Sequence, residues 1–74
     1  MAARPDDPTP GAVPGPDELT VLRLMAEGET VEAVARRLDV SERTVRRRAR
    51  SACTAVGVDT TVEAIVWAVR RRLI

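Results

Sequence analysis

Apolar residues recur at helical spacing in four parts of the chain, and each part is bounded by residues typical of helix ends. Gly15 and a following proline precede the first part, and Gly28 ends it. Thr30, Ser41 and Thr60 precede the other three parts and suit the N-cap position. The pattern predicts an all-α protein with helices over about 16–27, 31–38, 42–56 and 61–73.

The residues before the first predicted helix have a different composition. Residues 1–16 hold all five prolines and two of the four glycines of the chain. Proline cannot continue a helix, and so polar and Pro-rich a segment buries too little apolar surface to fold. We therefore expect a disordered Pro/Gly-rich tail over 1–15 and one folded domain over 16–74.

The predicted helix over 42–56 has two opposite faces. Its apolar residues form one stripe: Val45, Ala49, Ala52, Cys53 and Val56. Five arginines lie off this stripe, with Arg43, Arg47 and Arg50 opposite it and Arg46 and Arg48 at its flanks. A charge run is usually a solvated face, but Glu42 is the only acidic residue between Val40 and Gly57. Because guanidinium groups suit phosphates and guanine edges, this helix favours nucleic-acid binding.

The helices predicted over 31–38 and 42–56 are joined by about three residues. Two short helices in this order, the second one cationic, are typical of a helix-turn-helix unit. In such a unit the second helix enters the DNA major groove, and the start of the first, at Thr30 and Val31, would donate backbone N–H groups to a phosphate. An ordinary helical hairpin is the alternative, and the arginine face favours DNA binding over it.

The predicted helix over 61–73 is apolar over more than one face. We assign its core stripe to Val62, Ile65, Val66, Val69 and Leu73. Four further apolar residues fall off that stripe: Ala64, Trp67, Ala68 and Ile74. A small domain has little of its own protein to cover a second apolar face, so we expect these four to pair with a second copy. The alternative is that Trp67 closes the core of a monomer.

Composition and charge narrow the function classes. The chain has no His, no Tyr, a single Cys and no clustered carboxylates, which disfavours an enzyme, a cofactor and a His/Cys metal site. With Trp67 as its only aromatic residue, it offers RNA bases little to stack on. Residues 1–42 carry a net charge of −5 and residues 43–74 one of +6, so the second half should face an anionic partner. Neither a signal peptide nor a membrane span is evident, so we expect a cytoplasmic protein.

Several segments together resemble the DNA-binding domain of LuxR-type transcriptional regulators, the group that includes small stand-alone spore-coat regulators. The resemblance covers residues 16–74 and is carried by VLRLMAEG at 21–28, VARRL at 34–38, VSERTVR at 40–46, VGV at 56–58 and TVEAI at 61–65. It implies a four-helix bacterial regulator that reads the major groove with its third helix and forms a two-fold dimer through its fourth. We therefore expect double-stranded DNA and a second copy of the chain as partners, and no membrane.

Carried over by position, the resemblance assigns roles to individual residues of the predicted helix over 42–56. Arg46, Arg47 and Arg50 match sites that usually face base edges, and Thr44 matches a phosphate-contacting threonine. Arg43 stays a candidate for phosphate. The chain departs from the family pattern where Arg48 replaces a frequent histidine, Asp39 a turn glycine and Ala33 an acidic residue, and where Ala52 and Ala55 replace larger side chains.

Two functions remain open at this point. The first is a sequence-specific DNA-binding regulator acting as a homodimer. The second is a protein-interaction module of helix-turn-helix shape that docks on another regulator or on RNA polymerase. A sigma-factor region 4 is a nearby alternative with a similar helix-turn-helix core, but the capped fourth helix after Gly57 argues against it. We expect no attached receiver or ligand-sensing domain, so control would come from expression level, dimerisation or another protein.

Overall fold

The computed structural model describes residues 13–74, and within that range it consists of helices and their connections, with no strand. The helices are α1 (Pro16–Ala26), α2 (Val31–Leu38), α3 (Glu42–Val56) and α4 (Thr61–Arg70). The predicted all-α fold is confirmed, and the predicted bounds agree to within one residue except at the end of α4, which stops three residues early. Most of the predicted disordered tail, residues 1–12, lies outside the described residues.

Three of the four helices begin at a side-chain cap that the sequence predicts. In each, the hydroxyl oxygen of the N-cap residue accepts a hydrogen bond from the N–H three residues on: Thr30 from Ala33 at 3.1 Å, Ser41 from Thr44 at 3.0 Å and Thr60 from Glu63 at 3.2 Å. α1 begins at Gly15, whose own N–H donates to the Glu18 carboxylate at 2.8 Å. These bonds satisfy N–H groups that a helix leaves without partners in its first turn.

All four helices end in the same way, with one residue in the left-handed conformation. Gly28 (φ 94°) and Gly57 (φ 77°) supply it after α1 and α3, Asp39 (φ 56°) after α2 and Arg72 (φ 57°) after α4. The N–H of the next residue then reaches back to a carbonyl of the last turn, as Leu73 does to Ala68 at 2.9 Å. Since Arg72 reverses the chain without a glycine, the early end of α4 had no signal in the sequence.

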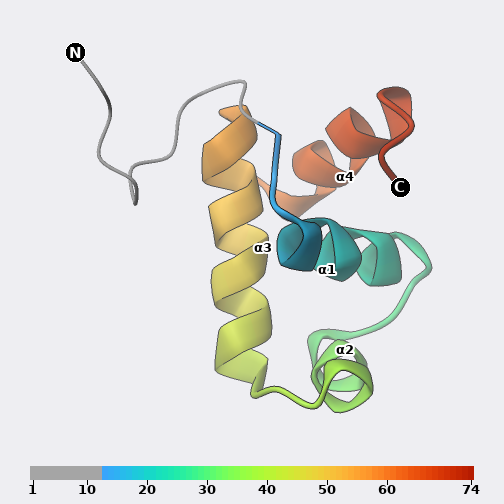
Figure 1. Ribbon diagram of the computed structural model, residues 1–74, viewed down its shortest axis with the longest axis vertical. Coiled ribbons are helices and arrows are strands. Elements are labelled where there is room, and N and C mark those ends of the chain that lie inside the picture. The colour runs from blue at the N-terminus through green and yellow to red at the C-terminus, as the bar shows by residue number, and fades with distance from the viewer. Residues whose placement is uncertain (1–12) are drawn as a thin grey trace.

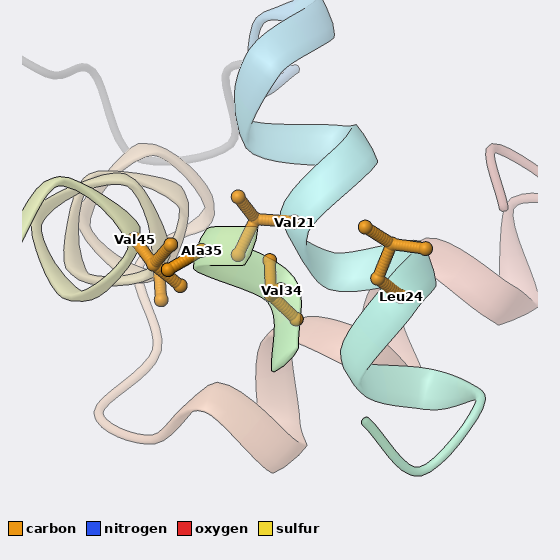
Figure 2. Close-up of a cluster of buried hydrophobic side chains, with 6 residues drawn as sticks. Val21, Leu24, Val34, Ala35 and Val45 are labelled. Carbon is orange, nitrogen blue, oxygen red and sulfur yellow. The ribbon is translucent and has the colours of Figure 1, made fainter. Parts of the chain in front are cut away.

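The helices pack around α1, which lies across the middle of α3 with α2 and α4 toward opposite ends (Figure 1). One group of buried residues joins α1, α2 and α3, as Figure 2 shows: Val21, Leu24, Val34, Ala35, Val45 and Ala49. A second group joins α1, α3 and α4: Leu22, Ala52, Cys53, Val56, Ala64 and Ala68. α3 contributes to both groups, so its rotation about its own axis is fixed from end to end.

The predicted assignment of the two faces of α4 was wrong, except that Ile65 of the predicted core stripe is partly buried against the core. Ala64 and Ala68 are completely buried, whereas the valines expected in the core, Val62, Val66 and Val69, have 69%, 43% and 50% of their surface exposed. Ala52 and Cys53 of α3, which are also small, belong to the same core group as Ala64 and Ala68, so small side chains from both helices form the centre of this contact.

Ala64 and Ala68 are consequently unavailable to a second copy, because the domain's own core covers them. Trp67 and Ile74, also expected at a dimer contact, are partly buried against the same core group. The Arg71 guanidinium lies 4.4 Å from the centre of the Trp67 ring. The outward apolar face of α4 is therefore the valine face, consisting of Val62, Val66 and Val69.

No single helix within residues 13–74 is long and apolar enough to span a membrane. Only α3 and α4 taken together reach the required length and composition, and these two helices are bent by 60° where they meet.

Candidate nucleic-acid interface

Four arginines of α3 gather on one exposed face of the helix. Arg43, Arg46, Arg47 and Arg50 are spaced i, i+3, i+4 and i+7, and together they line an open groove with no other residue type. The opposite side of the helix carries Val45 and Ala49, which are buried against α1 and α2. Because that side is fixed in the core, these four side chains, which we call the arginine face, must point to solvent.

Acidic side chains compensate little of this charge. Arg46 pairs with Glu42 at 3.2 Å, one turn earlier on the same helix. Among the ion pairs of residues 13–74, none involves Arg43, Arg47 or Arg50. Four guanidinium groups with a single paired carboxylate produce a strongly positive local potential. The arginine face is thus suited to a partner that presents several negative charges.

The two remaining candidates on α3 lie away from the arginine face. Arg48 is turned toward the start of α1, where its guanidinium lies 3.8 Å from the Asp17 carboxylate and its side chain is 26% exposed. The Thr44 hydroxyl accepts a hydrogen bond from the Ser41 hydroxyl at 3.0 Å, and the Thr44 N–H donates to the same cap. Thr44 is thus part of the N-cap of α3, half-buried, with its hydroxyl hydrogen still available to a phosphate.

The start of α2 lies beside the arginine face, as the helix-turn-helix interpretation predicts. Val31 lines a pocket together with Arg46 and Arg50. The same two arginines also line the arginine groove, so the pocket and the groove are adjacent. Thr30 caps α2 through the N–H of Ala33, which leaves the N–H groups of Val31 and Glu32 without partners inside the helix. A helix start beside two guanidinium groups is a favourable position for a phosphate.

The same pocket contains two polar residues that the sequence did not point to, Asp59 and Thr61. They come from the α3–α4 connection and the first residue of α4, and the fold brings them beside Arg50. Their approach depends on the angle between α3 and α4, which no local pattern encodes. Asp59 adds a negative charge at this edge of the cationic surface.

The chemistry available at this surface is anion binding. No group of three or more His, Cys, Asp or Glu side chains that could hold a metal ion occurs within residues 13–74. Cys53, the one thiol, is buried in the second core group, and the sequence contains no histidine that could activate it. The surface therefore offers hydrogen-bond donors and positive charge.

Comparison with known families agrees with the geometry. The family model described as bacterial regulatory proteins, luxR family, matches residues 16–68, from the first residue of α1 into α4. No curated protein matches the chain significantly. Members of the matched family are regulatory, non-enzymatic proteins whose helix-turn-helix domains bind DNA. The match spans most of the four-helix domain and includes the whole arginine face. The chain therefore belongs to the luxR family of bacterial regulatory proteins.

Proposed function

We propose that this protein is a sequence-specific transcriptional regulator that inserts α3 into the major groove of double-stranded DNA. The observation that carries the proposal is the arginine face, with four guanidinium groups on one exposed side of a helix held rigidly by the core. The major groove of B-DNA admits an α-helix, and its walls are rows of phosphates. Arginines on such a helix can bind both the phosphates and the bases.

The start of α2 supports the orientation of this complex. With α3 in the major groove, the pocket that Val31 shares with Arg46 and Arg50 would face the backbone at the groove edge. The free N–H groups at the start of α2 and the Arg46 guanidinium would then bind one phosphate from two sides. Contacts of this type fix the register of the protein on the duplex without reading the sequence.

The valine face of α4 supports a dimer of two copies around a two-fold axis. A two-fold interface brings the same patch of each copy together, so the patch must be self-complementary. Glu63 and Arg70 lie on the same flank of the valine face, three residues before and four residues after Val66. If two α4 helices cross in antiparallel orientation at Val66, Glu63 of each copy approaches Arg70 of the other. The dimer would place two α3 helices on the two halves of a symmetric operator.

A protein-interaction module is the second candidate, and the same valine face favours it. An exposed apolar strip on a helix can also receive a helix of another regulator or of RNA polymerase. In that case the valine face would matter for partner binding, and neutralising the arginine face would have no effect on it. The regulator is expected to bind duplex DNA on its own, whereas the protein-interaction module is not.

The decisive experiment measures binding to labelled duplex DNA by fluorescence anisotropy over a series of salt concentrations. We expect the affinity to fall steeply with salt, because bound arginines displace counterions from several phosphates. On a duplex selected from a random library, Arg47→Ala should weaken binding by about 1–3 kcal/mol.

Arg23→Ala is the matched control, because it removes one positive charge from α1, where Arg23 is paired with Glu27 at 3.3 Å. It should change the affinity by much less than Arg47→Ala. Absence of binding to any duplex at low salt, by protein shown to be folded, would contradict the proposal and favour the protein-interaction module.

A further inference from the structure

We propose that each half-site read by α3 contains a short run of guanines. The inference rests on the proposed function and adds to it the class of DNA sequence that the arginine face selects. Its basis is that the long side chains lining the groove on the exposed side of α3 are all arginines. The bases preferred in the half-site are therefore those that guanidinium groups can distinguish by their hydrogen-bonding edges.

A guanidinium group carries hydrogen-bond donors and no acceptor. In the major groove, guanine presents two neighbouring acceptors, N7 and O6, which match two parallel donors of one arginine. Adenine presents an acceptor beside a donor, cytosine a donor, and thymine one acceptor beside a methyl group. Only guanine therefore satisfies two donors of the same arginine, so a face made of arginines prefers guanine over each of the other bases.

The side chains that usually read other bases are missing from this face. Asn and Gln, which bind adenine through two hydrogen bonds, do not occur anywhere in the 74 residues. Glu42, an acceptor suited to cytosine, is held by Arg46 at 3.2 Å. The Thr54 hydroxyl, at the far end of the helix, donates to the Arg50 carbonyl at 3.0 Å. The face consequently has no side chain that binds adenine through two hydrogen bonds and no free carboxylate for cytosine.

The spacing of the arginines sets the length of the run. Arg43, Arg47 and Arg50 have no ion pair among the described residues and lie four and three positions apart. At about 1.5 Å of rise per residue they span roughly 10 Å of helix axis. Base pairs are stacked about 3.4 Å apart along the DNA axis, so a helix inclined to that axis covers at most about three base pairs over this distance. We assign these three arginines to two or three successive guanines.

Arg46 is the member of the face that we assign to the backbone. Among the ion pairs of residues 13–74, Arg46 is the one member of the arginine face that has a partner, Glu42. Like Arg50, it also borders the pocket that contains Val31 at the start of α2. This position is at the edge of the face, toward the side where the phosphate is expected. The assignment separates one positioning arginine from three that read bases, and it exchanges the roles that the family resemblance implies for Arg43 and Arg46.

The test begins with selection from a random duplex library and continues with base analogues in the selected site. We expect the selected half-sites to share two or three adjacent guanines. Replacing one of them by 7-deazaguanine removes N7 and should weaken binding about tenfold or more. Replacing it by inosine leaves N7 and O6 in place and removes only the minor-groove amino group, so affinity should change by less than about twofold.

A double-mutant cycle identifies the arginine that reads each guanine. In Arg47→Ala, the loss caused by 7-deazaguanine should disappear at one position of the half-site and persist at the others. Glu42→Ala should leave the guanine preference intact.

The outcomes separate this inference from the proposed function. If the protein binds duplex DNA but selects sites without adjacent guanines, or is indifferent to 7-deazaguanine, the arginines bind phosphates only and the guanine assignment is wrong. If it binds no duplex at all, the proposed function and the inference are both wrong.

Discussion

α3 and α4 are built alike on the inside and differ on the outside. Both begin at a hydroxyl N-cap, and both place small residues such as Ala52 and Ala64 at their mutual contact. Outward, α3 presents four arginines, whereas α4 presents three valines flanked by Glu63 and Arg70.

This difference shows that the inner faces alone determine how the two helices pack. The outer faces are free to differ, and their chemistry suits different kinds of surface. A cationic face suits a polyanion, and an apolar face suits another apolar surface. In a domain of this size, two neighbouring helices can thus serve DNA binding and dimerisation separately.

The largest effect is expected from a charge on the inner face of α4. Ala64→Arg places a guanidinium where the side chain is completely buried, and it should lower the free energy of unfolding by about 3 kcal/mol or more. The matched control is Val62→Arg, two residues away and 69% exposed, which should change it by less than about 0.5 kcal/mol. Urea denaturation followed by circular dichroism, at a concentration where both variants are monomeric, measures the difference.

Because Ala64→Arg risks unfolding the domain altogether, Ala64→Val provides a milder version of the same test. The extra methyl groups should cost about 1–3 kcal/mol by overpacking the contact with α3. If Ala64→Val and Val62→Arg had the same free energy of unfolding, the inner face of α4 would be assigned incorrectly.

The same contact explains what the sequence could and could not predict about α4. On α3, arginines on one side and apolar residues on the other left a single possible inner face, and Val45 and Ala49 are buried as expected. On α4 both sides are apolar, so periodicity could not choose between them. The choice depends on the small size of Ala52 and Cys53 on the facing helix, which is tertiary information.

In the candidate interface too, some features could be predicted from the sequence and others depend on tertiary structure. The grouping of Arg43, Arg47 and Arg50 follows from helical spacing. The helix-turn-helix interpretation predicted that the start of α2 would lie at the DNA-binding surface, and Val31 does share a pocket with Arg50. The orientation of Arg48 toward Asp17 required the position of α1. The presence of Asp59 required the angle between α3 and α4.

A charge on the outer face of α4 should separate dimerisation from DNA contact. Val66→Arg places like charges at the centre of the proposed two-fold interface, so the protein should become monomeric in analytical ultracentrifugation. Its affinity for a symmetric operator should fall on the order of a hundredfold through lost avidity, while its affinity for an isolated half-site stays unchanged. Arg47→Ala should do the reverse, with an intact dimer and a weaker half-site.

An exchange of charges provides the control for the dimer geometry. Glu63→Arg and Arg70→Glu should each weaken the dimer, and the double variant should restore it, because the two residues face each other across an antiparallel pair. A dimer that survives Val66→Arg would place the interface elsewhere.

The smallest effect is expected where the two helices are most alike, at their caps. Ser41→Ala and Thr60→Ala each remove an acceptor for an N–H of the first turn, and each should lower the free energy of unfolding by about 1 kcal/mol. Thr54→Ala is the control, because this hydroxyl donates to a carbonyl inside α3 and its loss should cost less than about 0.5 kcal/mol. Thermal denaturation of the three variants compares them. A cost for Thr54→Ala as large as for the cap variants would argue against capping as the cause.

The arginine face has a consequence for the protein when no partner is bound. Its four guanidinium groups lie at spacings where like charges repel across a helix surface, and this repulsion lowers the stability of α3 when no partner is bound. Dissolved salt screens that repulsion and favours the folded free protein, but the same ions compete with a duplex for the arginines. Raising the ionic strength should therefore stabilise the free domain while it weakens the complex. Duplex DNA and dissolved anions are alternative counterions for one side of a single helix.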